Sequence, residues 1–111
     1  MKGNQFTGNL TDLSKIAAIQ DVEMNWVIGT LEHRGKTYNF QAKIFAEPSS
    51  FGINDGRISK LSILNGKKWR SDTEIFNYDR GYDFGKKSGI GIAKLIVNAI
   101  DGTTETLDLD D

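Results

Sequence analysis

The stretch from Trp26 to Leu64, WVIGTLEHRGKTYNFQAKIFAEPSSFGINDGRISKLSIL, decides the fold of this chain. Its middle part alternates apolar and polar residues with the period of two that a half-buried strand requires. One face carries Tyr38, Phe40, Ala42, Ile44 and Ala46, and the other face carries Thr37, Asn39, Gln41 and Lys43. We therefore predict a strand over about 36–46, with one face in the core and the other in water.

Turn-forming residues divide the surrounding sequence into further strands. Gly35 lies where a short hairpin needs a positive φ, Pro48 cannot donate a ladder hydrogen bond, and Asn65-Gly66 favours a tight turn. The strands that these turns separate are predicted at about 25–32, 36–46, 57–64 and 73–78. Because short turns join antiparallel strands, we expect a four-stranded antiparallel meander.

Four apolar residues between 51 and 64 do not fit this simple alternation. The loop at 47–56 contains Phe51 and Ile53, which we expect to fold back over an edge of the core. In the strand that follows, Ile58 and Leu64 fall on the opposite face from Leu61. This mismatch predicts a β-bulge or partial cover of the second face.

A helix is predicted near the end of the chain, over about 90–100. Its apolar residues recur at helical spacing: Ile92, Ala93, Ile96, Val97 and Ile100. Ser88 is the expected N-cap, and Gly102 is placed to end the helix. A helix laid across one face of the sheet buries both apolar surfaces, so the predicted fold class is α+β.

The two ends of the chain carry weaker patterns. Residues 1–10 are polar and contain glycine, so we expect them to be flexible or peripheral. Thr11 or Asp12 can cap a short helix in which Leu13 and the residues at i+3 and i+4 share a face. The acidic stretch 103–111 is expected to be a frayed end or a short edge strand. The whole chain, 1–111, is predicted to be a single domain.

Composition excludes several kinds of chemistry. The chain has no Cys, which excludes disulfides and thiolate sites, and its single His33 lies in a predicted turn. The acidic tail lacks the spacing of a calcium loop, so we expect no metal and no cofactor. No apolar run is long enough to cross a membrane, and we expect no secretory signal, because residues 1–20 contain no long continuous apolar run. We expect a cytoplasmic protein that is not an enzyme.

Charge is distributed unevenly along the chain. Residues 57–94 carry nine basic and four acidic side chains, whereas residues 95–111 carry five acidic side chains and none that is basic. Aromatic residues lie among these cations, as they do in base-stacking surfaces and in protein interfaces. The candidate binding residues for a partner or nucleotide are Lys67, Lys68, Trp69, Arg70, Arg80, Tyr82, Lys86 and Lys87.

Two simpler interpretations of the same residues stay open. The aromatic side chains can belong to the core, with the cations as a solvated rim. The glycines Gly81, Gly85, Gly89 and Gly91 can form a flexible connection between the last strand and the helix, or a loop that binds phosphate together with Lys86 and Lys87. Their spacing matches neither a P-loop nor a dinucleotide-binding fingerprint.

Two motifs resemble a known group of sequences. Residues 42–49 followed by 51–61, AKIFAEPS and FGINDGRISKL, and residues 78–83, YDRGYD, are similar to a family of small uncharacterised proteins found mostly in phages and prophages. The resemblance covers roughly residues 26–100 and implies no catalytic residues. It implies a phage or prophage setting, where small accessory proteins often act by binding host components.

These observations lead to two expected functions. The first is a non-enzymatic accessory protein in the host cytoplasm that binds a host protein, for example to inhibit a host defence system. The alternative is a protein that binds or sequesters nucleic acid or a small nucleotide, for which the wet strand face at Thr37, Asn39, Gln41 and Lys43 is polar enough. Open sheet edges also allow a homo-oligomer.

Overall fold

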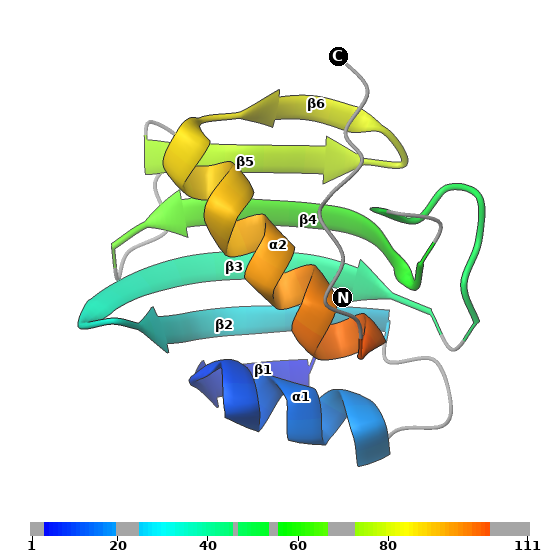
Figure 1. The fold of residues 1–111 in the computed structure, drawn as a ribbon, viewed down its shortest axis with the longest axis horizontal. Coiled ribbons are helices and arrows are strands. Elements are labelled where there is room, and N and C mark those ends of the chain that lie inside the picture. The colour runs from blue at the N-terminus through cyan, green and yellow to red at the C-terminus, as the bar shows by residue number, and fades with distance from the viewer. Residues whose placement is uncertain (1–3, 20–24, 46, 54–55, 67–72, 103–111) are drawn as a thin grey trace.

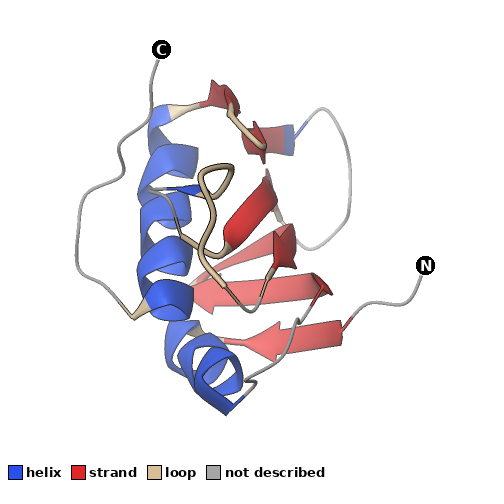
Figure 2. Cartoon of the chain, turned by 90° about the vertical axis from the view of Figure 1, so that its right-hand side faces the viewer, coloured by secondary structure: helices blue, strands red, loops and turns tan. Residues whose placement is uncertain are grey.

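The chain forms two layers, a six-stranded sheet and two helices that lie on one of its faces (Figures 1 and 2). The computed structural model describes residues 4–19, 25–45, 47–53, 56–66 and 73–102. The elements are β1 (Asn4–Gly8), α1 (Leu10–Ile19), β2 (Asn25–His33), β3 (Lys36–Ile44), β4 (Ile58–Asn65), β5 (Glu74–Asp79), β6 (Tyr82–Gly85) and α2 (Lys87–Asp101). The strands lie side by side in their order along the chain. The predicted α+β class is confirmed, but the prediction of four strands is wrong.

The four predicted strands are β2, β3, β4 and β5, and each pairs antiparallel with the next. In β3 the predicted inward residues Tyr38, Phe40, Ala42 and Ile44 are all buried. Ala46, assigned to the same face, lies outside the described residues. At the β2–β3 turn Gly35 has the expected positive φ of 77°. Strong period-two patterning therefore located the centre of the sheet correctly.

Residues 4–8, in the segment that was expected to be flexible or peripheral, form β1 at one edge of the sheet. β1 pairs in parallel with β2, with Phe6 opposite Gly29. Phe6 is buried, and its ring lies 5.8 Å from that of Phe40 in an edge-to-face arrangement. The strand has a single large apolar residue, so it has no alternating pattern for the sequence to show. Its position depends on the contact with Phe40 and on pairing with a strand distant in sequence.

Helix α1 crosses from β1 to β2, and its cap differs from the prediction. Asn9 is the capping residue in place of Thr11 or Asp12, since its side-chain Oδ1 accepts the Asp12 backbone N–H at 3.0 Å. The Asp12 carboxylate in turn accepts the Asn9 backbone N–H at 3.0 Å, which forms a reciprocal capping box. Leu13 is buried beneath the helix, as expected. The crossover places α1 beside α2 on the same face of the sheet (Figure 1).

Residues 82–85, expected to be part of a flexible connection, form the edge strand β6. A tight turn joins it to β5, with the Asp79 N–H donating to the Gly81 carbonyl at 3.0 Å and Arg80 at a φ of 57°. The Tyr82 ring packs 6.1 Å from that of Phe76. A strand of only four residues is too short to produce a recognisable alternation.

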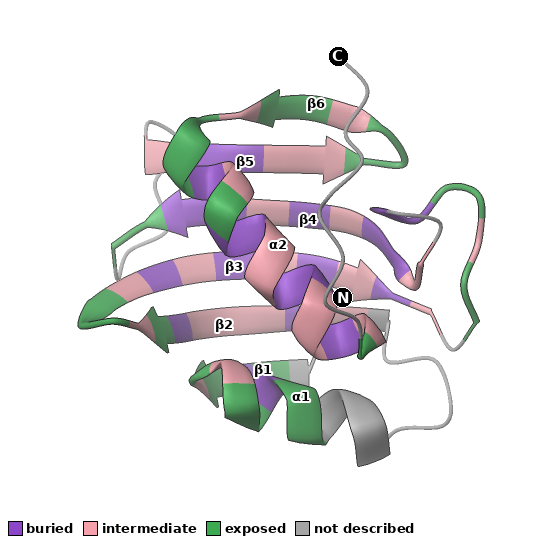
Figure 3. Ribbon diagram, in the orientation of Figure 1, coloured by how far each residue is buried: buried purple, intermediate pink, exposed green. Residues whose placement is uncertain are grey.

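Helix α2 runs diagonally across the sheet and closes the core. Its buried residues form one stripe that faces the strands (Figure 3): Gly89, Ile92, Ala93, Ile96, Val97 and Ile100. The helix begins at Lys87, three residues before the predicted start, and its N-cap is Lys86 rather than Ser88. Gly102 ends it in the left-handed conformation, with a φ of 70°, as predicted.

The loop before β4 contains two apolar residues that were expected to cover the core, and they differ in how far they are buried. Ile53 is buried, with 1% of its surface exposed, and it belongs to the core. Phe51 is 61% exposed, so the expectation that it folds over the core edge is wrong. The predicted bulge is present, because the register shifts between Lys43 and Ile44 and brings Ile58 opposite Ile44.

Gly89 and Gly91 have opposite roles in α2, which gives a direct test of how it packs. A Cβ on Gly89 would overlap the Ile75 carbonyl of β5, whereas a Cβ on Gly91 would meet nothing. We expect Gly89→Ala to lower the free energy of unfolding by about 2 kcal/mol or more. Gly91→Ala should raise it by about 0.5–1 kcal/mol, since alanine favours helix.

Urea unfolding followed by circular dichroism measures both changes. The two variants differ from the wild type by the same methyl group, two residues apart, so each is the control for the other. Equal effects of the two substitutions would contradict the close packing of α2 on β5.

Candidate binding surface on the open face of the sheet

Both described helices lie on one face of the sheet, and we call the opposite one the open face (Figure 2). Strand alternation places on it side chains that the core does not use. By register they are Gln5, Thr7, Trp26, Ile28, Thr30, Glu32, Thr37, Asn39, Gln41, Lys43, Lys60, Ser62, Glu74, Asn77, Asp79 and Phe84. Hydroxyl, amide, ammonium and aromatic groups predominate, which suits recognition of another molecule.

The two ends of the open face differ in how much is accessible. Leu64 pairs with Asn39, so its side chain belongs to the open face, yet only 2% of its surface is exposed. That end of the face is therefore partly covered. At the other end lie Trp26, Lys43 and Lys60, all of which are partly exposed.

An aromatic and cationic cluster occupies the accessible end. The Lys43 and Lys60 Nζ atoms lie 6.0 Å and 5.8 Å from the centroid of the Trp26 ring. Lys43 Nζ also lies 5.3 Å from the centroid of the Phe45 ring. Each such contact is worth about 0.5–1 kcal/mol at an exposed site. We refer to Trp26, Lys43, Phe45 and Lys60 as the Trp26 cluster.

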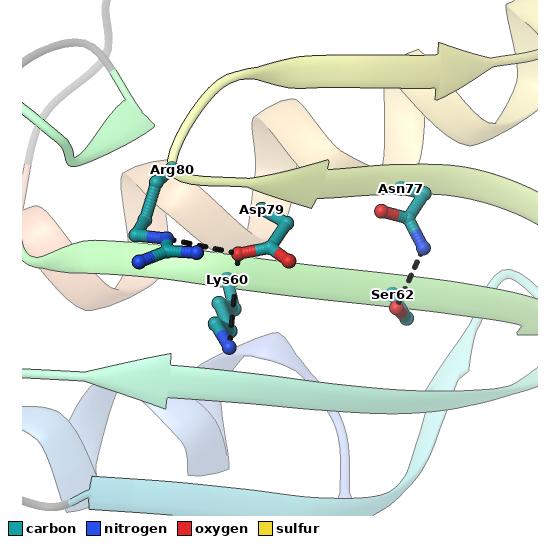
Figure 4. A network of polar contacts seen from close by, with 5 residues as sticks. All are labelled: Lys60, Ser62, Asn77, Asp79 and Arg80. Carbon is teal, nitrogen blue, oxygen red and sulfur yellow. Dashed lines mark hydrogen bonds and ion pairs between the residues drawn. The ribbon is translucent and has the colours of Figure 1, made fainter.

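The β5–β6 turn adds a carboxylate and a third cation to this end of the face. Asp79 Oδ1 lies 3.7 Å from Lys60 Nζ and accepts a hydrogen bond from Arg80 Nε at 3.3 Å (Figure 4). The Arg80 backbone N–H donates to the Ser59 carbonyl at 2.8 Å, which holds the turn against the bulge of β4. Two cations thus contact the Asp79 carboxylate, and Lys43 lies one strand further along, so this end of the face carries a positive excess.

Neutral polar groups occupy the middle of the open face. Asn77 Nδ2 lies 3.3 Å from Ser62 Oγ (Figure 4). The same Nδ2 lies 2.9 Å from Glu74 Oε2, and Gln41 is the register partner of Ser62. Amides and hydroxyls can both donate and accept hydrogen bonds. They therefore suit a ligand with a polar edge, such as a peptide strand or a nucleobase.

The predicted binding residues that the structure describes lie in different parts of the fold. Lys67, Lys68, Trp69 and Arg70 lie outside the described residues. Arg80 joins the open face near the Trp26 cluster, whereas Tyr82 is half-buried and packs against the core. Lys86 and Lys87 are exposed at the start of α2, where the Lys86 N–H bonds the Ile75 carbonyl at the far end of β5. The described members of the predicted set do not form one surface.

Sequence reasoning missed Trp26, Phe45 and Lys60 as members of a shared site. Lys43 was recognised only as part of a polar strand face. Trp26 precedes buried Val27, and this alternation signals that it points away from the core. The pairing of three strands, which brings the residues together, has no local signal in the sequence.

The motif at residues 51–61 contains two glycines and an arginine that hold the fold together. A Cβ on Gly52 would overlap the Gly56 carbonyl, and one on Gly56 would overlap the Asp101 carboxylate. Arg57 links three parts of the chain: its Nε donates to the Phe45 carbonyl at 2.9 Å, and its backbone N–H donates to Asp101 Oδ1 at 3.2 Å. The segment thus ties the end of β3 to the end of α2.

Burial raises the pKa of the Asp101 carboxyl, although the backbone hydrogen bond from Arg57 and the charge of Arg57 both lower it. The folded protein therefore holds this proton more tightly than the unfolded chain does. The stability that this group contributes is present at low pH and is lost as the pH rises through its raised pKa.

His33 lies at the end of β2, beside an open cavity of about 590 Å³ between the β2–β3 turn and the start of α1. Arg34, Lys36 and Asn9 also line this cavity. Within the described residues, no group of three or more His, Asp or Glu side chains is arranged to hold a metal ion. No helix in the described part of the chain is long and apolar enough to span a membrane.

The carboxyl of Asp101 gives a test of pH dependence. We expect Asp101→Asn to become more stable relative to the wild type as the pH rises from the ordinary aspartate range toward neutrality. The amide is never charged, so it removes the desolvation cost and can still accept the Arg57 N–H. Urea unfolding across this range, with Asp83→Asn on exposed β6 as the matched control, measures the effect. The reverse trend would mean that attraction to Arg57 outweighs burial.

Comparison with known proteins places this scaffold in a family. The model of a domain of unknown function, DUF7678, matches residues 25–100, from the first residue of β2 to the last turn of α2. No curated protein and no solved structure matches the chain. The matched region contains the meander, the Trp26 cluster and α2, and β1 and α1 precede it. Because the match spans more than half of the sequence, the chain belongs to the DUF7678 family.

Proposed function

We propose that this protein is a non-enzymatic binding protein and that the open face is its binding surface. The observation that carries the proposal is the asymmetry of the sheet. One face is buried beneath α1 and α2, whereas the other carries the Trp26 cluster and a row of amide and hydroxyl groups. A sheet needs only one buried face for stability, so the chemistry of the second is available for recognition.

The side chains on the open face support binding rather than catalysis. Lysine, amide and hydroxyl groups at the surface recognise charge and hydrogen-bonding edges. A general base needs a pocket and an orienting partner. The carboxylate of the cluster, Asp79, is exposed and already bonded to Arg80 and Lys60. Its arrangement favours a role in holding the two cations in place.

One candidate partner is a protein of the host cell, in the phage setting that the resemblance implies. Phe51 favours it, since this large apolar side chain is 61% exposed while its backbone is well held. The Phe51 carbonyl accepts the Tyr78 hydroxyl at 3.1 Å, and its N–H donates to Ser49 Oγ at 3.2 Å. A fixed, exposed aromatic ring is a typical anchor of a protein interface. Inhibition of a host defence system is one outcome of such binding.

The proposal that the open face binds a partner is tested by adding one negative charge to the sheet and, in a second variant, one to the helix layer. Ser62→Glu puts a carboxylate in the middle of the open face, and Ser14→Glu puts one on the exposed side of α1. Purified variants are incubated with lysate of the bacterial host, and the retained protein and nucleic acid are measured. We expect Ser62→Glu to weaken retention at least about tenfold, or 1.4 kcal/mol, and Ser14→Glu to leave it unchanged.

Thermal unfolding of both variants checks that the fold is intact. Loss of retention with Ser14→Glu but not with Ser62→Glu would place the binding surface on the helices. That result would overturn the proposal.

Phe51 is tested separately because it lies in a loop. Phe51→Ser should change the free energy of unfolding by less than about 0.5 kcal/mol, since surface substitutions rarely do more. If a host protein binds there, its retention should fall while the retention of other molecules does not. Phe84→Ser on β6 removes an exposed ring from the open face itself, so it tests that surface separately from the Phe51 loop. Unchanged retention with Phe51→Ser would exclude this anchor.

A further inference from the structure

We infer that the Trp26 cluster is a binding site for single-stranded nucleic acid, in which Trp26 stacks on a base and Lys43 and Lys60 contact phosphates. The inference rests on the proposed function, because it names the ligand of the same open face.

Three members of the Trp26 cluster lie in one row across β2, β3 and β4, and Asp79 of β5 ends that row. Register places Trp26 of β2 opposite Lys43 of β3, Lys43 opposite Lys60 of β4, and Lys60 opposite Asp79 of β5. Neighbouring strands lie about 4.8 Å apart, so the two intervals from Trp26 to Lys60 span about 10 Å. An extended strand of nucleic acid can lie along a row of this length, with ring and cations on the same side of the sheet.

The ring and the ammonium groups are arranged for stacking with phosphate contact. The Lys43 and Lys60 Nζ atoms lie over the Trp26 ring, about 6 Å from its centroid, as in a cation–π contact. Proteins that bind single strands combine a stacking ring with a positive groove, and one stacked base contributes about 1–3 kcal/mol. Phe45, beside Lys43, offers a second ring.

The charges on the open face favour an anion at this end. Lys43, Lys60 and Arg80 outnumber the single carboxylate of Asp79. Among the described residues no carboxylate lies within ion-pair distance of Lys43, so its charge is available to a phosphate. Glu74 lies toward the other end, opposite Leu64. A long anionic ligand is therefore drawn to the Trp26 cluster and repelled from the far end.

The neutral row next to the cluster can contact the edges of bases. Gln41, Ser62 and Asn77 are successive register partners, one row along the strands from the cations. They can donate to and accept from the Watson–Crick edge of an unpaired base. In a duplex those edges are already paired, so the flat face favours a single strand.

The test is binding of a fluorescently labelled ten-residue oligothymidine to the full chain, followed by anisotropy at several salt concentrations. Two phosphate contacts predict a log–log slope of about −1.4 against salt, since each contributes about −0.7 on a single strand. Lys43→Gln should reduce the slope by about 0.7. Trp26→Leu should weaken binding at least about fivefold, the lower limit for one stacked base, and Trp26→Phe should retain part of it.

Matched controls separate this site from unspecific attraction. Lys87→Gln makes the same charge change at the start of α2, and it should leave affinity and slope unchanged. In a Trp69→Phe background, Trp26 is the remaining tryptophan, and its fluorescence should be quenched by the oligonucleotide. Circular dichroism and thermal unfolding confirm that each variant is folded.

Failure of this inference can be told apart from failure of the proposed function. Absence of oligonucleotide binding by the wild type at low salt, or equal losses with Lys43→Gln and Lys87→Gln, would overturn the nucleic-acid site. Equal or tighter binding of duplex DNA would overturn the preference for a single strand. If Ser62→Glu still abolished retention of a host protein in these cases, the proposed function would stand with a protein as partner.

Discussion

Burial of one face of the β2–β5 meander beneath α2 is the constraint on which the rest of the structure depends. The helix approaches so closely at Gly89 that its backbone contacts the Ile75 carbonyl. This approach lets Ile92, Ala93, Ile96 and Val97 reach the strands, and α1 packs beside α2 on the same face. Because both helices use that face, the side chains opposite are released from the core and can serve recognition.

The motif residues around 51–61 mainly hold the scaffold. Ile53 contributes to the core, Gly52 and Gly56 allow close backbone contacts, and Arg57 joins the ends of β3 and α2. These contacts close the side of the molecule where the long loop crosses from β3 to β4. Phe51 is the exception, since it is exposed on a loop that its neighbours hold in place. Most residues of this motif therefore stabilise the fold, and Phe51 is the one position in it that we assign to recognition.

The Trp26 cluster shows how sheet register creates a site from scattered residues. Trp26, Lys43, Lys60 and Arg80 are separated by at least 17 positions in the sequence. Antiparallel pairing places the first three in one row, and the turn bond to Ser59 brings Arg80 alongside. The bulge of β4 matters here, because it keeps both Lys60 on the open face and Ile58 in the core.

The sequence by itself determined the central meander, the helix α2 with its C-terminal glycine, and the bulge, because alternation and helical spacing are local and strong in β3 and α2. It did not determine β1 and β6, which are short and have little pattern, or the start of each helix. It also grouped Arg80 with Tyr82, Lys86 and Lys87, although only Arg80 lies near the described cluster. Only the tertiary structure decided which cations meet an aromatic ring. Register between strands distant in sequence fixes those neighbours, and no single segment carries that information.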